Sequence, residues 1–400
     1  MELISRPFYY SKVEKFLGKG ILIVLTGQRR VGKSYVMREI AQKKQTADAC
    51  VIYIDKEKTD FDFIQDYKDL VSYINGQMVP NRHVYILIDE VQEIKEFERG
   101  LRNYYDRPDI DIIVTGSNSE TLSSDLATLL AGRYVEIFIQ GLSYGEFLTF
   151  HRLEDNDDAI RMYINYGGLP GLRPMGLDDP EVISQYLQGV YNTILVKDIV
   201  SRMEVRNVPF LENLIKFTGD NIGKPLSATN IQNYMATNKN EVSRNLILKY
   251  LKAIADAFLV HNVTRYNLHG KKLLENNDKY YFGDVGLRNY VVGGRRVDDI
   301  EKLVENLVFL HLIRMGYKVN VGQMFSTEID FVATKGDNTI YVQASYLIAE
   351  ESTFKREFGN LQKISDNFPK YVVSMTPFMD SGKYDGIIHI PLRQFLKDSI

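Results

Sequence analysis

Two short stretches of the sequence combine residues that could bind a nucleoside triphosphate. The first is GQRRVGKS, residues 27–34, which fits the pattern G-x-x-x-x-G-K-[ST]. Its glycines let backbone N–H groups face a phosphate, Lys33 can reach the outer phosphates, and Ser34 can hold Mg²⁺. With the next residue of the helix, the predicted contacts to ATP are Gly27, Gln28, Arg29, Arg30, Val31, Gly32, Lys33, Ser34 and Tyr35.

The second stretch is VYILIDEVQ, residues 84–92, in which an apolar run ends in two carboxylates. Asp89 could hold Mg²⁺ through water, and Glu90 could orient or activate an attacking water. Taken alone, the two could also be solvated loop carboxylates. Beside a phosphate-binding loop, however, they predict a site that hydrolyses ATP, with Mg²⁺ as cofactor.

Two further residues are candidates for contact with the terminal phosphate. Asn118, in IIVTGSNS, could sense the γ-phosphate, with Ser117 or Ser119 as substitutes, or this segment could cap a helix. Arg133 could supply positive charge to the transferring phosphoryl group, or it could be a surface arginine. A role for Arg133 across a subunit interface would require an oligomer.

The elements that must position these residues are short runs rich in Val and Ile. They are ILIVLT (21–26), CVIYID (50–55), VYILID (84–89), DIIVTG (111–116) and YVEIFIQ (134–140), with helix-like stretches between the first four. Continuous apolar runs are typical of strands buried on both faces. The sequence therefore predicts a parallel sheet with helices on both faces, in which ligands bind at the carboxyl edge.

The composition fits a soluble multidomain protein. The 400 residues carry a net charge of -3 with 44% hydrophobic residues, so any basic surface must be local. Cys50 is the only cysteine, which excludes an internal disulfide and suits the reducing cytoplasm. No apolar run is long enough to span a bilayer, so no membrane association is expected.

Beyond residue 142 the pattern changes twice. We predict a core over 1–142, a helical lid or linker over 143–206, a winged-helix domain over 207–295 and an α/β domain over 296–400. In the third part, LSATNIQNYMATNKNEVSRNLILKYLKAIADAFLV resembles a helix-turn-helix before a wing. Its basic residues Lys239, Arg244, Lys249 and Lys252 could contact DNA. The alternatives are a solvated helix or one that reports the nucleotide state to the core.

Several motifs together resemble those of AAA-like P-loop ATPases with a C-terminal DUF4143 region. They are LTGQRRVGKS, LIDEVQ, TGSNS, LAGRYVEIFIQGLSYGEF, YGGLPG and KYYFGDVGL, in that order. The resemblance covers nearly the whole chain. It implies a P-loop ATPase core, a winged-helix unit and a C-terminal domain similar to the restriction-endonuclease fold.

In that fold the resemblance places a helix with Glu305, a strand with Asp330, and a following strand that carries a Glu-x-Lys pair in active nucleases. Here the pair is replaced by Gln343 and Ser345. Gln343 brings no negative charge for a divalent ion, and Ser345 brings no cation for the scissile phosphate. We therefore expect a degenerate domain without nuclease activity that binds a protein or nucleic acid.

The resulting hypothesis is an ATP-hydrolysing protein whose nucleotide cycle between ATP and ADP drives a conformational switch, with DNA or an unknown protein as partner. Two alternatives remain open at this stage. One is an ATP-regulated nuclease, and the other is an interaction protein that binds ATP without hydrolysing it. ATP turnover and DNA cleavage distinguish the three.

Overall fold

The computed structural model describes residues 4–117, 133–203, 205, 207–237, 242–270, 272–294, 299–324, 327–348, 351–377 and 383–397. The described chain forms two compact units, the first comprising residues 1–140 with 256–258 and the second residues 141–255 with 259–400. The predicted core boundary at residue 142 lies close to this division. The three domains predicted beyond it, however, lie within one unit.

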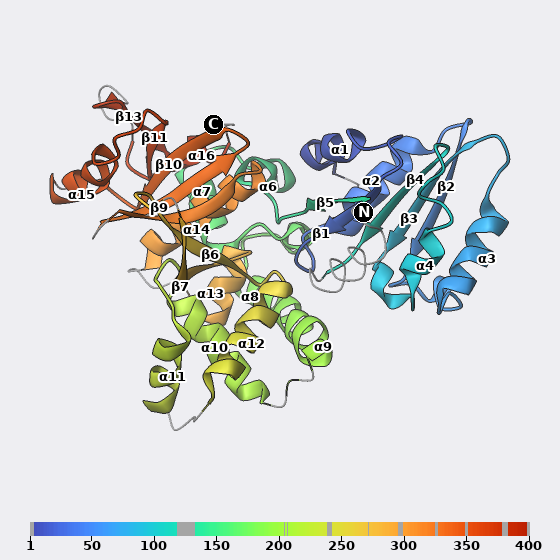
Figure 1. Cartoon of the computed structure of the whole chain (residues 1–400), viewed down its shortest axis with the longest axis horizontal. Helices are drawn as coiled ribbons and strands as arrows, with labels where there is room; N and C mark the ends of the chain where they lie inside the picture. Colours follow the sequence, from blue (N-terminus) through green and yellow to red (C-terminus); the bar gives the residue numbers. More distant parts are fainter. Residues whose placement is uncertain are drawn as a thin grey trace. The chain divides into compact units, whose positions relative to one another are not determined.

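The first unit is built on a five-stranded parallel sheet with the order β2-β3-β4-β1-β5 (Figure 1). All five predicted strands are present: β1 (Leu22–Thr26), β2 (Ala49–Asp55), β3 (His83–Asp89), β4 (Ile110–Thr115) and β5 (Tyr134–Phe138). Every residue of β1 is buried, as expected for a strand covered on both faces. The predicted parallel α/β sheet is therefore confirmed.

Helices cover this sheet and connect its strands. They are α1 (Pro7–Glu14), α2 (Lys33–Lys44), α3 (Tyr67–Gln77) and α4 (Phe97–Leu101), with the short 3₁₀ turns η1 (Thr59–Phe61) and η2 (Val91–Glu93). Leu70 and Ile74 of α3 and Phe97 of α4 pack with Val24 and Ile86 in one apolar core on one face of the sheet. On the other face α2 packs against β2, β3 and β4, so the start of α2 is fixed at the end of β1.

The second unit begins with helices. They are α6 (Tyr144–His151), α7 (Asp157–Tyr166), η3 (Pro170–Met175), α8 (Pro180–Thr193), the π-helical η4 (Ile194–Val200), α9 (Ser201–Met203), α10 (Val208–Asp220), α11 (Ala228–Thr237) and α12 (Arg244–Asp256). The YGGLPG turn after α7 is held by the GDVGL segment, since the Gly168 N–H donates to the Asp284 carboxylate at 2.7 Å. A side chain at Gly167, where φ is +77°, would place its Cβ 2.2 Å from the same carboxylate. The two motifs therefore form one packed junction.

An eight-stranded sheet follows, with the order β12-β13-β11-β10-β9-β8-β6-β7. Its strands are β6 (Val260–Asn267), β7 (Lys272–Phe282), β8 (Lys318–Met324), β9 (Thr327–Lys335), β10 (Asn338–Ser345), β11 (Lys370–Ser374), β12 (Lys383–Tyr384) and β13 (Ile387–Pro391). The remaining helices are α13 (Val285–Val291), α14 (Ile300–Arg314), α15 (Glu351–Gln362) and α16 (Leu392–Phe395). A core that includes Ile329, Tyr341, Phe358 and Val372 joins α15 to this sheet.

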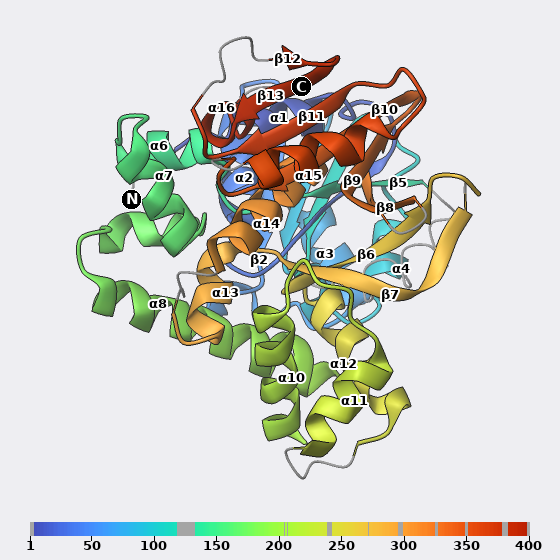
Figure 2. The same ribbon diagram turned by 90° about the vertical axis from the view of Figure 1, so that its left-hand side faces the viewer.

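The β6–β7 hairpin connects two of the predicted domains. It follows α12, as a wing would, but β6 also pairs in parallel with β8 between Arg265 and Val321 (Figure 2). The hairpin thus forms the edge of the C-terminal sheet, and the predicted winged-helix domain is not confirmed. Alternating apolar residues predict that a segment is a strand but do not specify its partner, which explains the difference.

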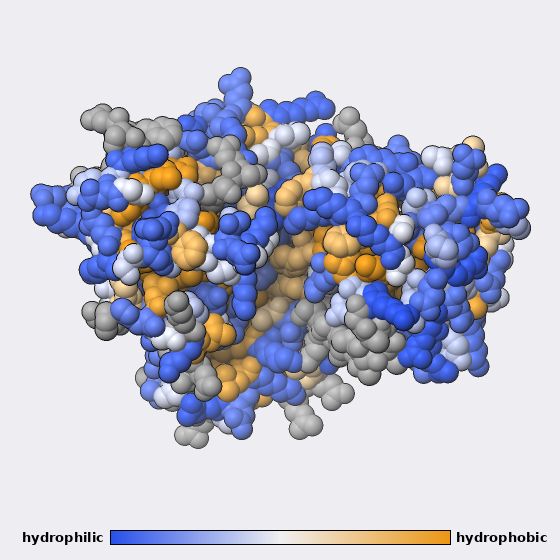
Figure 3. All heavy atoms as spheres, turned by 45° about the horizontal axis from the view of Figure 1, so that its top comes forward, coloured by the Kyte–Doolittle hydropathy of each residue, from blue (hydrophilic) through white to orange (hydrophobic). Residues whose placement is uncertain are grey.

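Polar residues cover most of the face drawn in Figure 3, and apolar residues form separate patches on it. The large apolar side chains that are exposed to solvent include Phe63 on the first unit and Tyr234 and Leu248 on the second. Among the described residues, no helix combines the length and the apolar character needed to cross a membrane.

Candidate nucleotide-binding site

The predicted phosphate-binding loop lies between the end of β1 and the start of α2. Gly27, Arg30 and Gly32 have φ values of 139°, 65° and 100°, so the backbone repeatedly enters the left-handed region that forms anion-binding concavities. A Cβ at Gly27 would lie 2.1 Å from the Ile139 carbonyl oxygen, so only glycine fits there. Gly32 caps α2, whose N-terminus is directed at the loop.

Lys33 is the buried cation of this loop. The residue is only 5% exposed, and its Nζ donates to the Gly27 carbonyl at 2.8 Å and to the Gln28 carbonyl at 3.1 Å. A phosphate oxygen in the loop would offer this ammonium group a charged acceptor, which gives a stronger bond. Arg29 carries an ion pair with Glu57 at 3.8 Å.

The two predicted carboxylates lie at the same edge of the sheet, at the end of β3. Asp89 is 1% exposed and accepts a hydrogen bond from Thr115 Oγ1 at 2.5 Å and another from Ser34. Burial raises the pKa of the Asp89 carboxyl above its usual value, and the carboxylates of Glu90 and Asp55 add to the rise. A divalent cation would offset this crowding of negative charge, so Ser34 and Asp89 fit the predicted Mg²⁺ ligands.

Glu90 adopts a left-handed backbone conformation with φ 54° and ψ 56°. Its N–H donates to Thr115 Oγ1 at 2.9 Å, and its carboxylate accepts a hydrogen bond from the Gln92 amide. A non-glycine residue in this region is uncommon and is held by its surroundings. The contacts therefore fix the direction of the Glu90 side chain after a sharp turn out of β3.

Sequence reasoning missed Thr115, which contacts both Asp89 and Glu90 from the neighbouring strand β4. It is fully buried, and its hydroxyl donates to Asp89 while accepting from the Glu90 N–H. Tyr53 on β2 adds a third donor to Asp89, after Thr115 and Ser34, at 3.3 Å. The only signal in the sequence was a polar residue at the end of an apolar strand, next to the segment proposed as a sensor.

We expect Thr115→Val to reduce ATP turnover about tenfold, because it removes one buried hydrogen bond from each carboxylate residue while keeping the side-chain shape. Thr115→Ser should restore most of the activity, since it keeps the hydroxyl. Steady-state phosphate release measures both variants. Equal loss in the Val and Ser variants would contradict the assigned role of the hydroxyl.

The structure does not bring Arg133 to this site. Its carbonyl pairs with the Leu22 N–H, at the start of β1, while the loop follows the end of β1. A strand of this length spans about 17 Å, which separates Arg133 from the loop of the same chain. Its guanidinium forms an exposed ion pair with Asp106 at 2.7 Å. Arg133 therefore lies away from the loop of its own chain, and its role across a subunit interface stays a prediction. The other candidate for contact with the terminal phosphate, Asn118, lies outside the described residues.

The nuclease-like residues of the second unit lie close together. The Asp330 N–H donates to Gln343 Oε1 at 3.3 Å, and the Ala344 N–H donates to Asp330 Oδ2 at 2.9 Å. Burial, and then the nearby Glu305 carboxylate, raise the pKa of Asp330 well above its usual value. Ser345 is 1% exposed and lies beside β11 in the sheet. The hairpin predicted from the resemblance is therefore present.

Sequence reasoning missed the cation of this cluster. Lys279, on β7, is 2% exposed, and its Nζ lies 3.1 Å from Glu305 and 2.7 Å from Glu328. The Glu305 carboxylate also accepts a hydrogen bond from Tyr281 at 2.6 Å. The positive charge absent from position 345 thus arrives from the hairpin that extends the sheet, and it is neutralised there by two carboxylates.

We expect no metal-dependent cleavage of DNA or RNA by this cluster. Lys279 is paired with two carboxylates, and the Gln343 oxygen already accepts the Asp330 N–H. In the described part of the chain, no three His, Cys, Asp or Glu side chains are grouped to hold a metal ion. Incubation of single- and double-stranded DNA and RNA with Mg²⁺ or Mn²⁺, with and without ATP, tests this. Cleavage that disappears in Asp330→Ala would support a nuclease instead.

Comparison with known families supports the first unit as an ATPase. The AAA domain family matches residues 19–148, and the domain of unknown function DUF8612 matches residues 157–298. The predicted DUF4143 region is not confirmed. The range of the AAA match includes the loop, Asp89, Glu90 and Thr115, and it supports ATP binding and hydrolysis.

The chain is similar to several known proteins and solved structures. An uncharacterised protein of Haemophilus influenzae is 33% identical over 393 residues, which cover 96% of each chain. One from Methanocaldococcus jannaschii is 26% identical over 360 residues, 85% of this chain and 78% of that protein. The solved Walker-type ATPase of Pyrococcus abyssi is similar in fold, with a TM-score of 0.53 and 15% identity over 72% of this chain and 95% of its own. The chain therefore belongs to the same family as the Haemophilus influenzae protein, and its residues 19–148 form an AAA-like P-loop ATPase domain.

Proposed function

We propose that the protein is a Mg²⁺-dependent ATPase in which hydrolysis changes the conformation of the nucleotide-binding unit. One observation carries the proposal. The loop with Lys33 and Ser34, and the strand end with Asp89 and Glu90, meet at one edge of the sheet, with Ser34 hydrogen-bonded to Asp89. Thr115 holds Asp89 and Glu90 in place from β4, the strand that lies between β3 and β1.

Each residue has a distinct role in this proposal. The loop N–H groups and Lys33 bind the phosphates, and Ser34 and Asp89 are placed to hold Mg²⁺. Bound there, the ion would neutralise charge on the phosphate oxygens. Glu90 orients the attacking water and accepts its proton. Its backbone is held at the strand end by Thr115, and its carboxylate is held by the Gln92 amide.

The direct test is phosphate release from ATP by the full chain, with Mg²⁺ and with excess EDTA. Turnover that requires Mg²⁺ supports the proposal. ATP binding without turnover would favour the alternative of an interaction protein that uses ATP as a ligand.

The switch itself needs a different measurement. A γ-phosphate held between loop and strand end orders segments that can relax after hydrolysis. Hydrogen exchange of the protein with ADP, compared with the Glu90→Gln variant in ATP, reports this change. Identical exchange in both states would rule out a nucleotide-driven switch.

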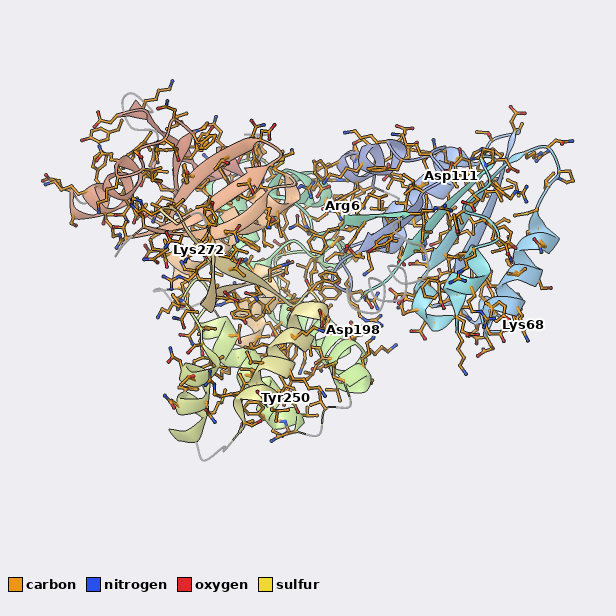
Figure 4. All side chains as sticks on the ribbon, viewed as in Figure 1. Arg6, Lys68, Asp111, Asp198, Tyr250 and Lys272 are labelled. Carbon is orange, nitrogen blue, oxygen red and sulfur yellow. The ribbon has the colours of Figure 1, made fainter. Side chains whose placement is uncertain are left out.

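One surface of the second unit favours DNA as a partner. On α12, Ile247, Tyr250, Leu251, Ala253 and Ile254 are buried, and the basic residues Arg244, Lys249 and Lys252 are exposed. Tyr250, labelled in Figure 4, marks the buried side of this helix. Such a face could place positive charge against a phosphate backbone. Lys239 lies outside the described residues.

We expect Arg244→Ala with Lys249→Ala to weaken DNA binding about tenfold at low salt and to reduce the slope of log affinity against log salt by about two, one for each phosphate contact. Both residues are exposed, so the fold should be retained. Fluorescence anisotropy with a labelled duplex measures the affinity at several salt concentrations. Lys216→Ala with Lys224→Ala, on and after α10, is the charge-matched control. Equal binding by both double variants would move the contact away from α12.

A further inference from the structure

Arg6 is a buried arginine outside the motifs that predicted the nucleotide site. It directly precedes α1, is 2% exposed and is labelled in Figure 4. Its guanidinium carbon lies 4.5 Å from the centre of the Tyr9 ring. The backbone N–H of Arg6 donates to a Glu39 carboxylate oxygen at 3.0 Å, which ties the segment before α1 to α2. A buried guanidinium requires acceptors for its N–H groups. The acceptors of Arg6 therefore show which segments of the chain it holds in place.

One of these partners is the phosphate-binding loop. Arg6 Nη1 donates to the Val31 carbonyl oxygen at 2.9 Å. That carbonyl and the Gly32 N–H belong to one planar trans peptide and so point in opposite directions. By holding the carbonyl, Arg6 turns the Gly32 N–H to the other side of the chain. A loop of this kind presents its N–H groups to a phosphate on that concave side.

A second partner of the Arg6 guanidinium is the backbone just beyond β5. The same Nη1 donates to the Gln140 carbonyl at 3.0 Å, and the Gln140 N–H donates to the Tyr9 hydroxyl at 3.0 Å. The preceding residue is fixed as well, because the Ile139 N–H donates to the Thr26 carbonyl at 2.8 Å. The carbonyl of Ile139 lies against Gly27 at the start of the loop. Residues 139–140 therefore form a fixed support against which Arg6 holds the loop.

We propose that Arg6 is a positioning residue for nucleotide binding, which orients the Val31–Gly32 peptide toward the phosphates by bridging it to Gln140. The inference rests on the proposed ATPase function. Arg6 acts through the backbone and does not touch the nucleotide. Loss of its guanidinium frees the peptide to rotate, so part of the binding energy must then be spent on ordering the loop.

The test compares Arg6→Gln and Arg6→Lys with the wild type. We expect Arg6→Gln to raise the Kd of both ATP and ADP about tenfold, because the loop contacts phosphates that the two nucleotides share. The value of kcat at saturating ATP should change less than about twofold, since the Glu90 turn is untouched. Arg6→Lys, which keeps a buried cation with donors, should show a smaller rise. Lys15→Gln, at the exposed end of α1, is the control with wild-type affinity.

A role in folding alone would lower the melting temperature of Arg6→Gln but leave both Kd values unchanged, and that result would overturn the proposal. If Arg6→Gln does not fold, Tyr9→Phe replaces it, since it removes only the hydroxyl that anchors Gln140. A rise of about threefold in both Kd values supports the proposal, and unchanged values overturn it. Failure of the wild type itself to bind ATP would instead refute the proposed function.

Discussion

Glu90→Gln is expected to bind ATP as tightly as the wild type and to hydrolyse it at least about 100-fold more slowly. The amide has nearly the shape of the carboxylate, so the left-handed turn and the N–H bond to Thr115 should remain. It cannot, however, accept a proton from the attacking water. Titration with a fluorescent ATP analogue measures binding, and phosphate release measures turnover.

The matched control is Glu93→Gln on the same short turn. Glu93 is exposed, so this variant makes the same chemical change without reaching the strand end. Its turnover should equal that of the wild type. If Glu90→Gln also hydrolysed ATP at the normal rate, another group would have to be the base, and the assignment from the Asp-Glu pair would be wrong.

Lys33→Ala should weaken ATP binding about 100-fold, because a charged hydrogen bond to phosphate contributes about 1.5–3 kcal/mol. The variant also removes the two bonds by which Lys33 holds the Gly27 and Gln28 carbonyls, so the shape of the loop is affected as well. The Kd is measured by titration, and the melting temperature with and without ATP gives an independent reading.

Lys68→Ala provides the charge-matched control for this experiment. Lys68 is exposed in the first turn of α3 and has no part in the loop. It should bind ATP like the wild type. An affinity of Lys33→Ala within about twofold of the wild type would show that the loop does not hold the triphosphate in the proposed way.

The site was predictable from sequence wherever neighbouring residues carry the chemistry. The loop and the Asp89–Glu90 pair are local patterns attached to buried strands, and a parallel sheet brings the ends of such strands to one edge. Thr115 and Arg6 have no such pattern. Their roles depend on the order β3-β4-β1 and on the bond to Val31, both of which arise only when distant segments meet.

In the second unit, too, local features were predictable from the sequence and contacts between distant segments were not. The strand that carries Asp330 and the next strand, which carries Gln343 and Ser345, were expected because they are neighbours in sequence and match one local motif. The pairing of β6 with β8 was not found, and Lys279 was missed with it, since its approach to Glu305 depends on that pairing. The match to DUF8612 also ends at residue 298, before β8 begins at Lys318, so this sheet extends beyond the matched region.

The pairing of β6 with β8 also matters while the chain is being made. The hairpin leaves the ribosome before β8 does. The intervening chain, which includes the two helices α13 and α14, must emerge before β8 can pair with β6. Until then the inner edge of β6 displays unpaired N–H and C=O groups, which can recruit a strand from another nascent chain. Slow translation between residues 267 and 318 would lengthen this exposure, whereas a chaperone that covers the edge would shorten it. Because of the order of synthesis, the edge of β6 is therefore protected only after β8 has been made.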